Sequence, residues 1–436
     1  MIKYVAHITL ELQSPLCIAS GLESSYSDTQ VRRDFNNLPV IPGTSLKGLI
    51  KSLASKEAKE YLGKDADNGN LGSSLVVSDA LLVNSQGKIH TQIDNSVFED
   101  HLLKQYQILP NREHVRINHL GVAVDKGKFT NAIVHSGSRF QLQLKLEASK
   151  AIDTVWEEML NLLYTADFLI GSQVTNGLGR VKPITVMQHK FNLKQPEDLK
   201  AFIELTPYAA IHGKEFIPTA TKTAFTLHEE FMFTTDAIHT GAGYGDDEVN
   251  MANVIEKAIL WKSNHEGVKV EDQYIIPGAS IKGVLRHRTF YYLCPAYNWA
   301  TESASLSDYA KQQTIAQAQL ETLFGSASEN EDGHIGSVII EDVCIPETAI
   351  AETIFQHNSI DRFTGGTLDK MLFSEKVYAI NELVCLKIWL HPKENIAPET
   401  LEAFKKAIAD LKYGQLALGG NTTNGNGFLK VTAHGN

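Results

Sequence analysis

The sequence predicts an α+β protein made of two copies of one domain, and two kinds of repeat support this fold class. The segment 41–48, I-P-G-T-S-L-K-G, returns at 276–283 as I-P-G-A-S-I-K-G. Residues 77–80 match residues 340–343 in the same order, and each half ends in a glycine-rich loop followed by an apolar strand. An ordered series of matches at a long period indicates a duplicated domain rather than a solenoid of short repeats.

The first copy has the pattern of a strand, a helix, two strands, a helix and a closing strand. Alternating apolar residues predict the first strand over 5–13, and Pro42 with Gly43 introduces the first helix. A hydroxyl of Thr44 or Ser45 can cap that helix by accepting from its first amides. The predicted elements are strands 5–13, 74–83, 139–147 and 180–186, with helices 45–61 and 152–169.

The second copy repeats this order. Its strands are predicted at 224–234, 337–343, 383–391 and 428–433, and its helices at 280–293 and 398–411. The order β-α-β-β-α-β is that of the ferredoxin-like fold, shared with the RNA-recognition motif. We expect two such domains, at 1–187 and 223–436, joined by a connector at 188–222 that contains a short helix. Four segments, 64–73, 84–138, 236–274 and 295–335, exceed ordinary connections, and long loops usually carry function or disorder.

Composition excludes several classes of protein. The chain is 43% hydrophobic and 21% charged, as in ordinary globular proteins, and its four cysteines form no C-x-x-C pair. It has no apolar run of about 20 residues and no signal-peptide pattern, so a cytoplasmic location is expected. No zinc, Walker A or serine-hydrolase motif is present, and we expect no metal or cofactor.

The net charge of -11 argues against a generic nucleic-acid binder. RNA binding nevertheless needs only a local basic face, and basic residues gather around the repeated motif. They are Arg32, Arg33, Lys47 and Lys51 in the first half, and Lys282, Arg286, His287 and Arg288 in the second.

The repeated motif itself is a candidate anion site. Free amides at a helix N-terminus favour anions, so Ser45 with Lys47, and Ser280 with Lys282, are candidate phosphate contacts. The alternative is a capped helix start with a surface lysine, and the matched repetition favours the anion site.

Two glycine loops are weaker candidates for phosphate contacts. Gly177 and Gly179 with Arg180, and Gly425 with Gly427 in the second copy, can bring bare backbone close to a phosphate. A tight helix-to-strand connection would explain each loop equally well. In the predicted fold both loops lie at the edge that holds the lysine-bearing helix, which favours a shared RNA-binding role.

With these motifs together, the chain resembles the RAMP superfamily, specifically the backbone subunits of type III CRISPR effector complexes, in tandem. The resemblance rests on residues 38–48 and 274–283, on 358–365, and on the terminal glycine loops. It covers the whole chain apart from the connector. The two-copy layout is most similar to the double backbone subunit of type III-D variant complexes.

The resemblance implies a subunit that grips the guide RNA (crRNA) and pairs it with a complementary target RNA. The implied protein partners are adjacent RAMP backbone subunits, a small subunit and a large polymerase/cyclase subunit. The long insertions are expected to approach the RNA duplex, at Arg116 and His119 in the first copy and at Asp361 and Arg362 in the second.

The resemblance also implies that an aspartate between the first strand and the I-P-G motif assists cleavage of the target RNA. Asp28 stands at that position. RNA carries its own nucleophile, the 2′-OH, so a carboxylate with Arg32, Arg33 or His119 nearby can supply a proton acceptor and charge neutralisation without a metal.

The second copy departs from this pattern. Aligning Val254 with Val31 places Met251 opposite Asp28, and Asp246 and Asp247 lie a few residues upstream. Either a shifted aspartate acts there, or this copy only grips RNA.

The expected function is therefore a guide-RNA-binding subunit with endoribonuclease activity from at least the first copy. The alternatives are a non-catalytic RNA scaffold and a stand-alone RAMP ribonuclease that processes precursor guide RNA. A nucleotide-binding enzyme using the glycine loops is disfavoured, because the lysine lacks its Walker context.

Overall fold

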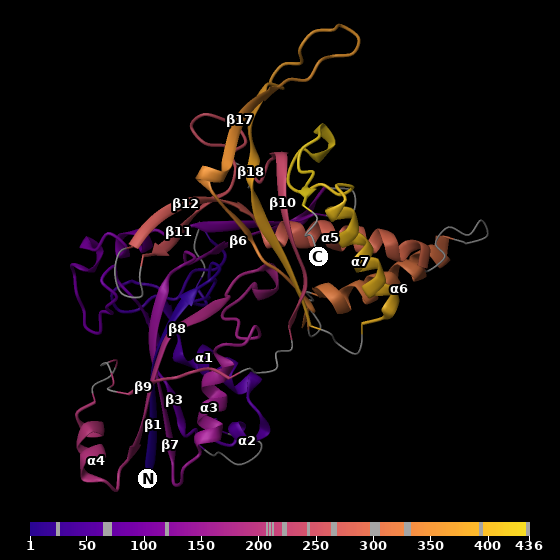
Figure 1. The fold of residues 1–436 in the computed structure, drawn as a ribbon. Coiled ribbons are helices and arrows are strands. Elements are labelled where there is room, and N and C mark those ends of the chain that lie inside the picture. Colours follow the sequence, from indigo (N-terminus) through magenta and orange to yellow (C-terminus); the bar gives the residue numbers. More distant parts are fainter. Residues whose placement is uncertain are drawn as a thin grey trace.

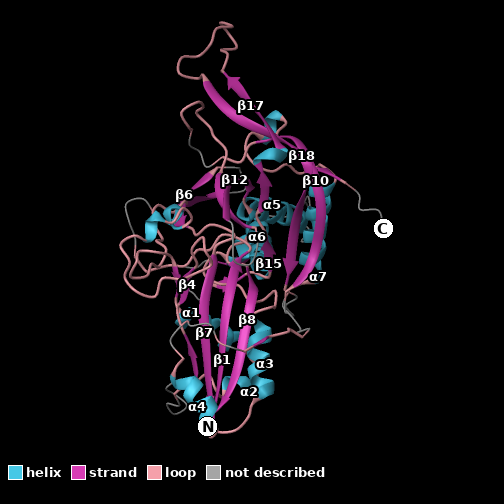
Figure 2. Cartoon of the chain, turned by 60° about the vertical axis from the view of Figure 1, so that its left-hand side comes forward, coloured by secondary structure: helices cyan, strands magenta, loops and turns pink. Residues whose placement is uncertain are grey.

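The two halves of the chain lie end to end, with the N-terminus at one end and a long two-stranded arm at the other (Figure 1, Figure 2). The computed structural model describes residues 1–22, 27–63, 72–117, 122–205, 208, 211, 213–219, 225–241, 245–262, 268–296, 306–326, 333–391 and 396–432. Each half has its own hydrophobic core.

The first half is built on one antiparallel sheet with strand order β2-β4-β7-β1-β8-β9, and β3 also pairs with β7. Its strands are β1 (Ile2–Leu12), β2 (Val40–Ile41), β3 (Leu75–Val77), β4 (Ala80–Leu82), β7 (Arg139–Ala148), β8 (Val181–Asn192) and β9 (Lys214–Glu215). The central strand β1 alternates inward residues such as Ile8, which lies opposite Leu142 on β7 and Val186 on β8. The helices α1 (Gly43–Leu53) and α3 (Asp153–Leu162) lie beside this sheet (Figure 2). Their apolar side chains belong to the same hydrophobic core as those of the sheet.

The second half repeats the plan with strand order β15-β18-β10-β19. Its strands are β10 (Thr226–Ile238), β15 (Val338–Ile340), β18 (Phe373–Leu390) and β19 (Lys430–Val431). Its helices are α5 (Gly278–Ala296), α6 (Leu306–Phe324) and α7 (Pro398–Lys412). Each β-α-β-β-α-β unit contributes four strands, which can be numbered from first to fourth along the chain. In both sheets these strands lie side by side in the order second, third, first, fourth, so the two halves share one topology.

The long insertions contain ordered structure. β5 (Asn111–Ile117) and β6 (Ala123–Ala132) form a hairpin in the first half. In the second half β17 (Ile350–His357) pairs with the beginning of β18 to form the arm. A separate sheet contains β11 (Ile255–Trp261), β12 (Val268–Ile276) and β16 (Val343–Pro346). The remaining short elements are η2 (Val97–Glu99), η3 (Leu103–Tyr106), η4 (Val174–Asn176), β13 (Gly325–Ser326), β14 (His334–Ile335), η5 (Glu347–Ala349) and η6 (Thr422–Asn424).

Some element bounds differ from the sequence-based expectation. The predicted helix 45–61 is interrupted, because α1 ends at Leu53 and the Ser55 hydroxyl caps a new short helix, α2 (Lys56–Lys59). The expected connector is partly sheet. β8 continues into it as far as Asn192, and after α4 (Pro196–Ile203) the short strand β9 pairs with β8. Among the helices of the described residues, none is both long and apolar enough to cross a membrane.

Candidate nucleic-acid interface

The glycine loop of the first half packs on the start of α5 in the second half. A Cβ added at Gly177, just after η4, would lie 2.6 Å from the carbonyl oxygen of Ile340. A Cβ added at Gly278 would lie 3.0 Å from the carbonyl oxygen of Asn176. Both positions therefore require glycine because two backbones meet there. One contact between the halves thus explains a glycine in each repeated motif.

A buried arginine also joins the two halves. Arg112, on β5, donates from Nε and Nη2 to Glu256 at 2.9 and 2.7 Å, and from Nη1 to Asp342 Oδ2 at 2.6 Å. The side chains of the three residues are 2 to 8% exposed. Burial disfavours the charged guanidinium, but Asp342 and Glu256 outweigh burial and raise the pKa of Arg112 above its ordinary value. No local sequence pattern predicts this ion triad, since its members are far apart in the chain.

Aspartates cap the two repeated helix starts. The Gly43 amide donates to Asp79 Oδ1 at 2.7 Å, and the Gly278 amide donates to Asp342 Oδ1 at 2.7 Å. The prediction that Thr44 or Ser45 caps the first helix is wrong, because the N-cap is Pro42 and no side chain at that position accepts a hydrogen bond. A carboxylate at a helix N-terminus is electrostatically favourable and satisfies an amide that a phosphate would otherwise use.

The two motif lysines lie in different environments. Lys282 is 8% exposed, and its Nζ donates to the carbonyl oxygen of Thr175 in the packed glycine loop at 3.3 Å. Burial, with a smaller effect of Arg286, lowers the pKa of Lys282 to about 7. Lys47 is half-buried, and burial together with Lys51 lowers its pKa. Lys282, predicted from the sequence to contact a phosphate, therefore lies inside the contact between the halves.

The lowered pKa of Lys282 predicts a pH-dependent stability. Between the folded value of about 7 and the ordinary 10.5, the unfolded chain binds a proton that the folded chain does not. The free energy of unfolding should therefore rise with pH across this range, by up to about 1.4 kcal/mol per pH unit relative to Lys282→Met. Urea unfolding of both proteins between pH 7.5 and 9 measures the difference. Parallel pH profiles would contradict the assignment.

Further cations gather at the same contact. Arg116 is exposed on β5, and its charge lowers the pKa of Arg286 on α5, behind the larger effect of burial. Glu321 acts in the opposite direction. Arg286 also lowers the pKa of Lys282, so Arg286 is repelled by Arg116 and in turn disfavours the charged form of Lys282. An anion such as a phosphate would relieve that repulsion. Ser280 is exposed at the start of the same helix.

Asp28 in the first half has a structural counterpart in Asn250 of the second. The Thr130 amide donates to Asp28 Oδ2 at 2.7 Å, and the Ser374 amide donates to Asn250 Oδ1 at 2.9 Å. Both side chains are exposed and hold the loop against the hairpin that follows it. The second copy thus has an amide where the first has a carboxylate.

Neighbouring β-bridges confirm that Asp28 and Asn250 occupy corresponding positions. Thr29 pairs in parallel with Asn131, and Met251 pairs in parallel with Glu375. Met251 is therefore the counterpart of Thr29, and the sequence alignment that placed it opposite Asp28 is wrong by one residue. The error arises because the two loops share no residue pattern that fixes their register.

The other aspartates proposed for the second copy have a different setting. Asp246 Oδ1 accepts from the amides of Glu248 and Val249 at 2.8 and 2.9 Å, and Asp246 Oδ2 accepts from Lys376 Nζ at 2.8 Å. The Lys376 ammonium, followed by the two amides, lowers the pKa of Asp246 to about 2. The Asp246 carboxylate therefore closes a turn and forms an ion pair with Lys376, whereas Asp247 is exposed beside it.

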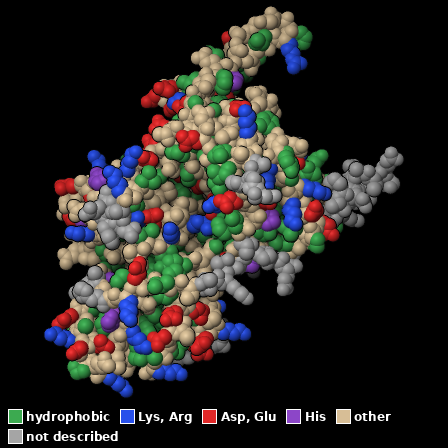
Figure 3. All heavy atoms as spheres, in the orientation of Figure 1, with side chains coloured by type: hydrophobic (Ala, Val, Ile, Leu, Met, Phe, Trp, Pro, Cys, Tyr) green, Lys and Arg blue, Asp and Glu red, His purple; other side chains and the backbone are tan. Residues whose placement is uncertain are grey.

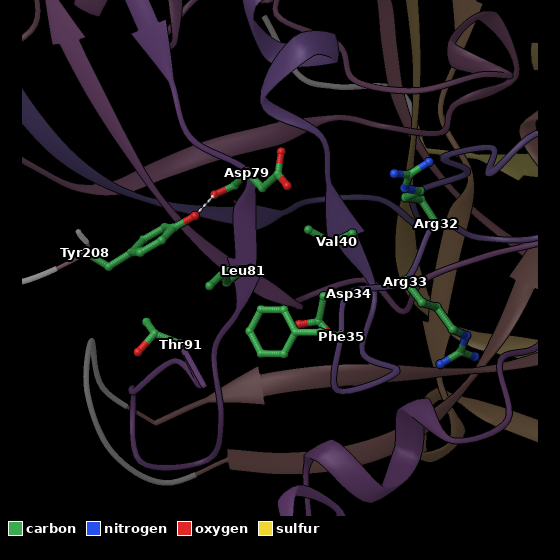
Figure 4. Close-up of a pocket in the computed structure, with 9 residues that line it drawn as sticks. All are labelled: Arg32, Arg33, Asp34, Phe35, Val40, Asp79, Leu81, Thr91 and Tyr208. Atoms are coloured by element: carbon green, nitrogen blue, oxygen red, sulfur yellow. Dashed lines mark hydrogen bonds between the residues drawn. The ribbon is translucent and has the colours of Figure 1, made fainter. Parts of the chain in front are cut away.

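The two arginines after Asp28 have separate roles. Arg33 Nη1 donates to the carbonyl oxygens of Asn37 and Tyr106 at 2.6 and 2.9 Å, so its guanidinium holds two loops together. Arg32 is exposed. In Figure 4 the two guanidinium groups point in different directions. Of the pair, Arg32 is the one whose charge is available to a ligand.

A cavity of about 290 Å³ lies beside the start of α1 (Figure 4). The Tyr208 hydroxyl forms one side and donates to the Asp79 carbonyl oxygen at 2.8 Å. The lining residues are Arg32, Arg33, Asp34, Phe35, Val40, Asp79, Leu81, Thr91 and Tyr208. Burial raises the pKa of Asp34, and two backbone amides partly offset that effect. The cavity thus combines apolar walls with two arginines and two aspartates.

Most of the remaining candidates from the glycine loops have structural roles inside the protein. Cβ atoms added at Gly179 and Gly427 would lie 1.9 and 1.8 Å from carbonyl oxygens of their own halves, so each loop needs glycine for its own turn. Arg180 pairs with Glu341 at 3.0 Å, and its guanidinium lies 4.4 Å from the ring centroid of Trp389. Gly425 alone has open space around it.

Two candidates from the long insertions remain, Arg362 and His119. Arg362 is exposed on the arm, where Asp361 Oδ1 accepts from the amides of Phe363 and Thr364 and closes the turn. His119 lies outside the described residues. Within the described ranges, no group of three or more His, Cys, Asp or Glu side chains is arranged to hold a metal ion.

One informative repeat was missed in the sequence. T-N-G-L-G at 175–179 returns as T-N-G-N-G at 423–427, and the two loops have the same backbone shape. In both, a left-handed residue precedes a 3-10 turn and a left-handed glycine follows it. Comparison of the two glycine loops residue by residue would have found this match.

Comparison with known families agrees with the two-part architecture. A model described as the RAMP superfamily matches residues 9–182 and 231–430. A search of curated proteins found no match to the chain. The two matched regions correspond to the two halves, and each contains one helix start, one glycine loop and one of the paired positions Asp28 and Asn250.

Proposed function

The chain belongs to the RAMP superfamily, and on that premise we propose that it is a backbone subunit that binds guide RNA in a type III CRISPR effector complex. Its first copy cleaves the complementary target RNA, and its second copy holds RNA without cleaving it. Its proposed partners are the guide RNA, the target RNA, adjacent RAMP subunits, a small subunit and a large polymerase/cyclase subunit. Its proposed arrangement is that of the double backbone subunit of type III-D complexes.

The observation that carries the proposal is the placement of Asp28. One carboxylate oxygen is fixed by the Thr130 amide on β6, and the exposed side chain leaves the other oxygen to a ligand. Arg32 is exposed four positions along the same loop. A fixed proton acceptor with a cation on the same loop is the minimum that RNA cleavage through the 2′-OH requires.

The proposed reaction uses only these groups and the substrate. Asp28 accepts the proton of the 2′-OH, and the 2′ oxygen attacks the adjacent phosphorus in line with the leaving 5′ oxygen. The products are a 2′,3′-cyclic phosphate and a 5′-hydroxyl, which takes its proton from water. Arg32 offsets negative charge on the phosphate during the attack.

The fold supports an RNA-binding role in both copies. The strand order second, third, first, fourth is that of the ferredoxin-like fold, which we propose for both halves. Local cations, rather than a continuous basic face, would contact RNA. On the face drawn in Figure 3, Lys and Arg side chains are interspersed with Asp and Glu, in keeping with a net charge of -11.

The grip on RNA can be tested through its salt dependence. Arg116 at the junction of the halves and Arg362 on the arm are exposed and are proposed to contact phosphates. Arg116→Ala and Arg362→Ala should each reduce the slope of log K against log salt by about one unit, with little dependence on RNA sequence. Filter binding of guide RNA at several salt concentrations measures this slope.

Lys200→Ala is the matched control, because Lys200 is an exposed cation on α4, at the opposite end of the molecule from the arm (Figure 1). Its salt slope should equal that of the unmodified chain. Equal slopes for all variants would place the RNA elsewhere.

A non-catalytic scaffold is the second candidate, and Arg33 favours it. The Arg33 guanidinium is occupied by two carbonyl oxygens, so of the two arginines that follow Asp28 only Arg32 remains to neutralise a phosphate there. A scaffold would bind guide and target RNA as tightly but leave the target intact whether residue 28 is aspartate or asparagine.

A further inference from the structure

Ser27, the residue before Asp28, carries a buried hydroxyl that the proposed reaction does not use. It is 6% exposed, whereas Asp28 is exposed. A side chain buried to this extent is not placed to touch RNA, so any part that it has in the reaction must act through a neighbour. A buried hydroxyl also needs hydrogen-bond partners of its own, and those of Ser27 lie around Asp28.

The Ser27 hydroxyl joins the Asp28 loop to the strand that anchors it. Its Oγ donates to the carbonyl oxygen of Thr29 at 2.8 Å, and the carbonyl oxygen of Thr130 lies 3.3 Å away as a second acceptor. The same Oγ accepts from the Ala132 amide at 3.1 Å. One hydroxyl thus ties the residues before and after Asp28 to each other and to β6.

The backbone contacts of this loop leave room for movement. The amides of Asp28 and Thr29 share one acceptor, the carbonyl oxygen of Thr130, at 3.1 and 3.3 Å. Most N–H···O hydrogen bonds are shorter, at about 2.9–3.0 Å. The Ala132 amide donates at 3.0 Å to the Thr29 carbonyl oxygen, the acceptor that Ser27 also uses. The hydroxyl therefore restrains the main chain at 28–29 where its own amide bonds are long.

The second copy holds its loop without such a hydroxyl. Val249 precedes Asn250 and is 4% exposed, so the counterpart of the buried serine fills space but forms no side-chain hydrogen bond. The Ser374 hydroxyl accepts from the Asn250 amide at 3.1 Å and donates to Asn250 Oδ1 at 3.2 Å, an oxygen that the Ser374 amide also reaches. Of the described residues, only Thr130, through its amide, donates to the Asp28 carboxylate.

We propose that Ser27 is a positioning residue for Asp28. By fixing the main chain on both sides of Asp28, its hydroxyl holds the free carboxylate oxygen where it meets the 2′-OH, with the 2′ oxygen in line with the leaving 5′ oxygen. In-line attack depends on this alignment, and a displacement of about 1 Å can slow such a step about 100-fold. The inference rests on the proposed function, because Ser27 has this role only if Asp28 accepts the proton.

Ser27→Ala tests the inference in the full chain assembled with guide RNA. The Ala132 amide keeps the Thr29 carbonyl oxygen as its acceptor, so the change leaves no buried amide unpaired. With the complex in saturating excess over target RNA, the single-turnover rate constant of cleavage should fall about tenfold, a smaller loss than that of the base itself. The Kd for target RNA should stay within about twofold, because Ser27 does not touch RNA.

The rate constant separates positioning from a loss of folded protein. A purely structural role would lower the fraction of target cleaved in one turnover and leave the rate constant of the folded complexes unchanged. Positioning should lower the rate constant and leave that fraction unchanged. Ser27→Cys gives a second measurement, because a thiol is a weaker donor than a hydroxyl. Its rate constant should lie between those of the unmodified chain and Ser27→Ala.

Ser20→Ala is the matched control. The Ser20 hydroxyl belongs to the same loop but accepts from the Leu22 amide at 3.2 Å, away from the contacts around Asp28, so its loss should leave the rate constant unchanged. An unchanged rate constant in Ser27→Ala, or equal slowing by Ser20→Ala, would overturn the inference. With Asp28→Asn inactive, either result would leave the proposed function standing. Full cleavage by Asp28→Asn would overturn both, since Ser27 would then have no base to position.

Discussion

Asp28→Asn should abolish cleavage of a complementary target RNA at one position and leave RNA binding almost unchanged. The amide oxygen can still accept from the Thr130 amide, so the loop keeps its geometry. The amide cannot accept the 2′-OH proton, and loss of a general base typically slows a reaction by about 10²–10⁴-fold. The variant gives the first copy the residue that the second copy has in Asn250. Gel analysis of end-labelled target with the assembled complex measures the loss.

Two further results belong to this test. Asp246→Ala with Asp247→Ala should remove no cleavage product, because Asp246 is engaged by Lys376 and two backbone amides. Cleavage by the unmodified protein should persist in a metal chelator, as the proposed chemistry needs no metal. Full cleavage by Asp28→Asn, or strict dependence on a divalent metal, would show that the reacting group lies elsewhere.

Arg112→Met should destabilise the chain by about 3–5 kcal/mol, the usual result of removing one partner from a buried ion pair. Glu256 and Asp342 would remain, with side chains 8 and 2% exposed, as two carboxylates facing each other without a cation. The contact between the halves should weaken most, since Arg112 links β5 to the second half. Urea unfolding measured by circular dichroism gives the change in the free energy of unfolding.

The matched control removes the carboxylate charges as well. Arg112→Met combined with Glu256→Gln and Asp342→Asn should recover much of the lost stability, and the amide oxygen introduced at position 342 can still cap α5. A loss of less than about 1 kcal/mol for Arg112→Met, or a triple variant no more stable than the single one, would contradict the assigned role of the triad.

The order of elements could be predicted from the sequence because periodicity and turn residues are local signals. The strand β7 and the helix α7 lie close to their expected ranges of 139–147 and 398–411. The helix caps could not be predicted in the same way. The carboxylate that caps Gly43 comes from Asp79, which reaches the helix only after the sheet has formed.

The candidate site could likewise be predicted only where local sequence signals determine it. Asp28 stands in a loop whose position could be inferred, but its counterpart depends on a pairing between Asn250 and Ser374 that no local pattern encodes. Lys282 has the sequence of a surface lysine at a helix start. It is buried because the glycine loop of the other half packs on it, and a sequence pattern does not reveal which loop that is.

Covalent linkage of the two halves has a consequence for how the chain would lie along RNA. The internal contact forms between tethered partners at high effective concentration, so its occupancy does not depend on how much protein is present. The tether also fixes which half follows which. If each half spans one segment of guide as proposed, Asp28 and Asn250 must alternate in a set order. Cleavage would then be directional within each chain, with a cut at one segment and an intact stretch of target held at the next.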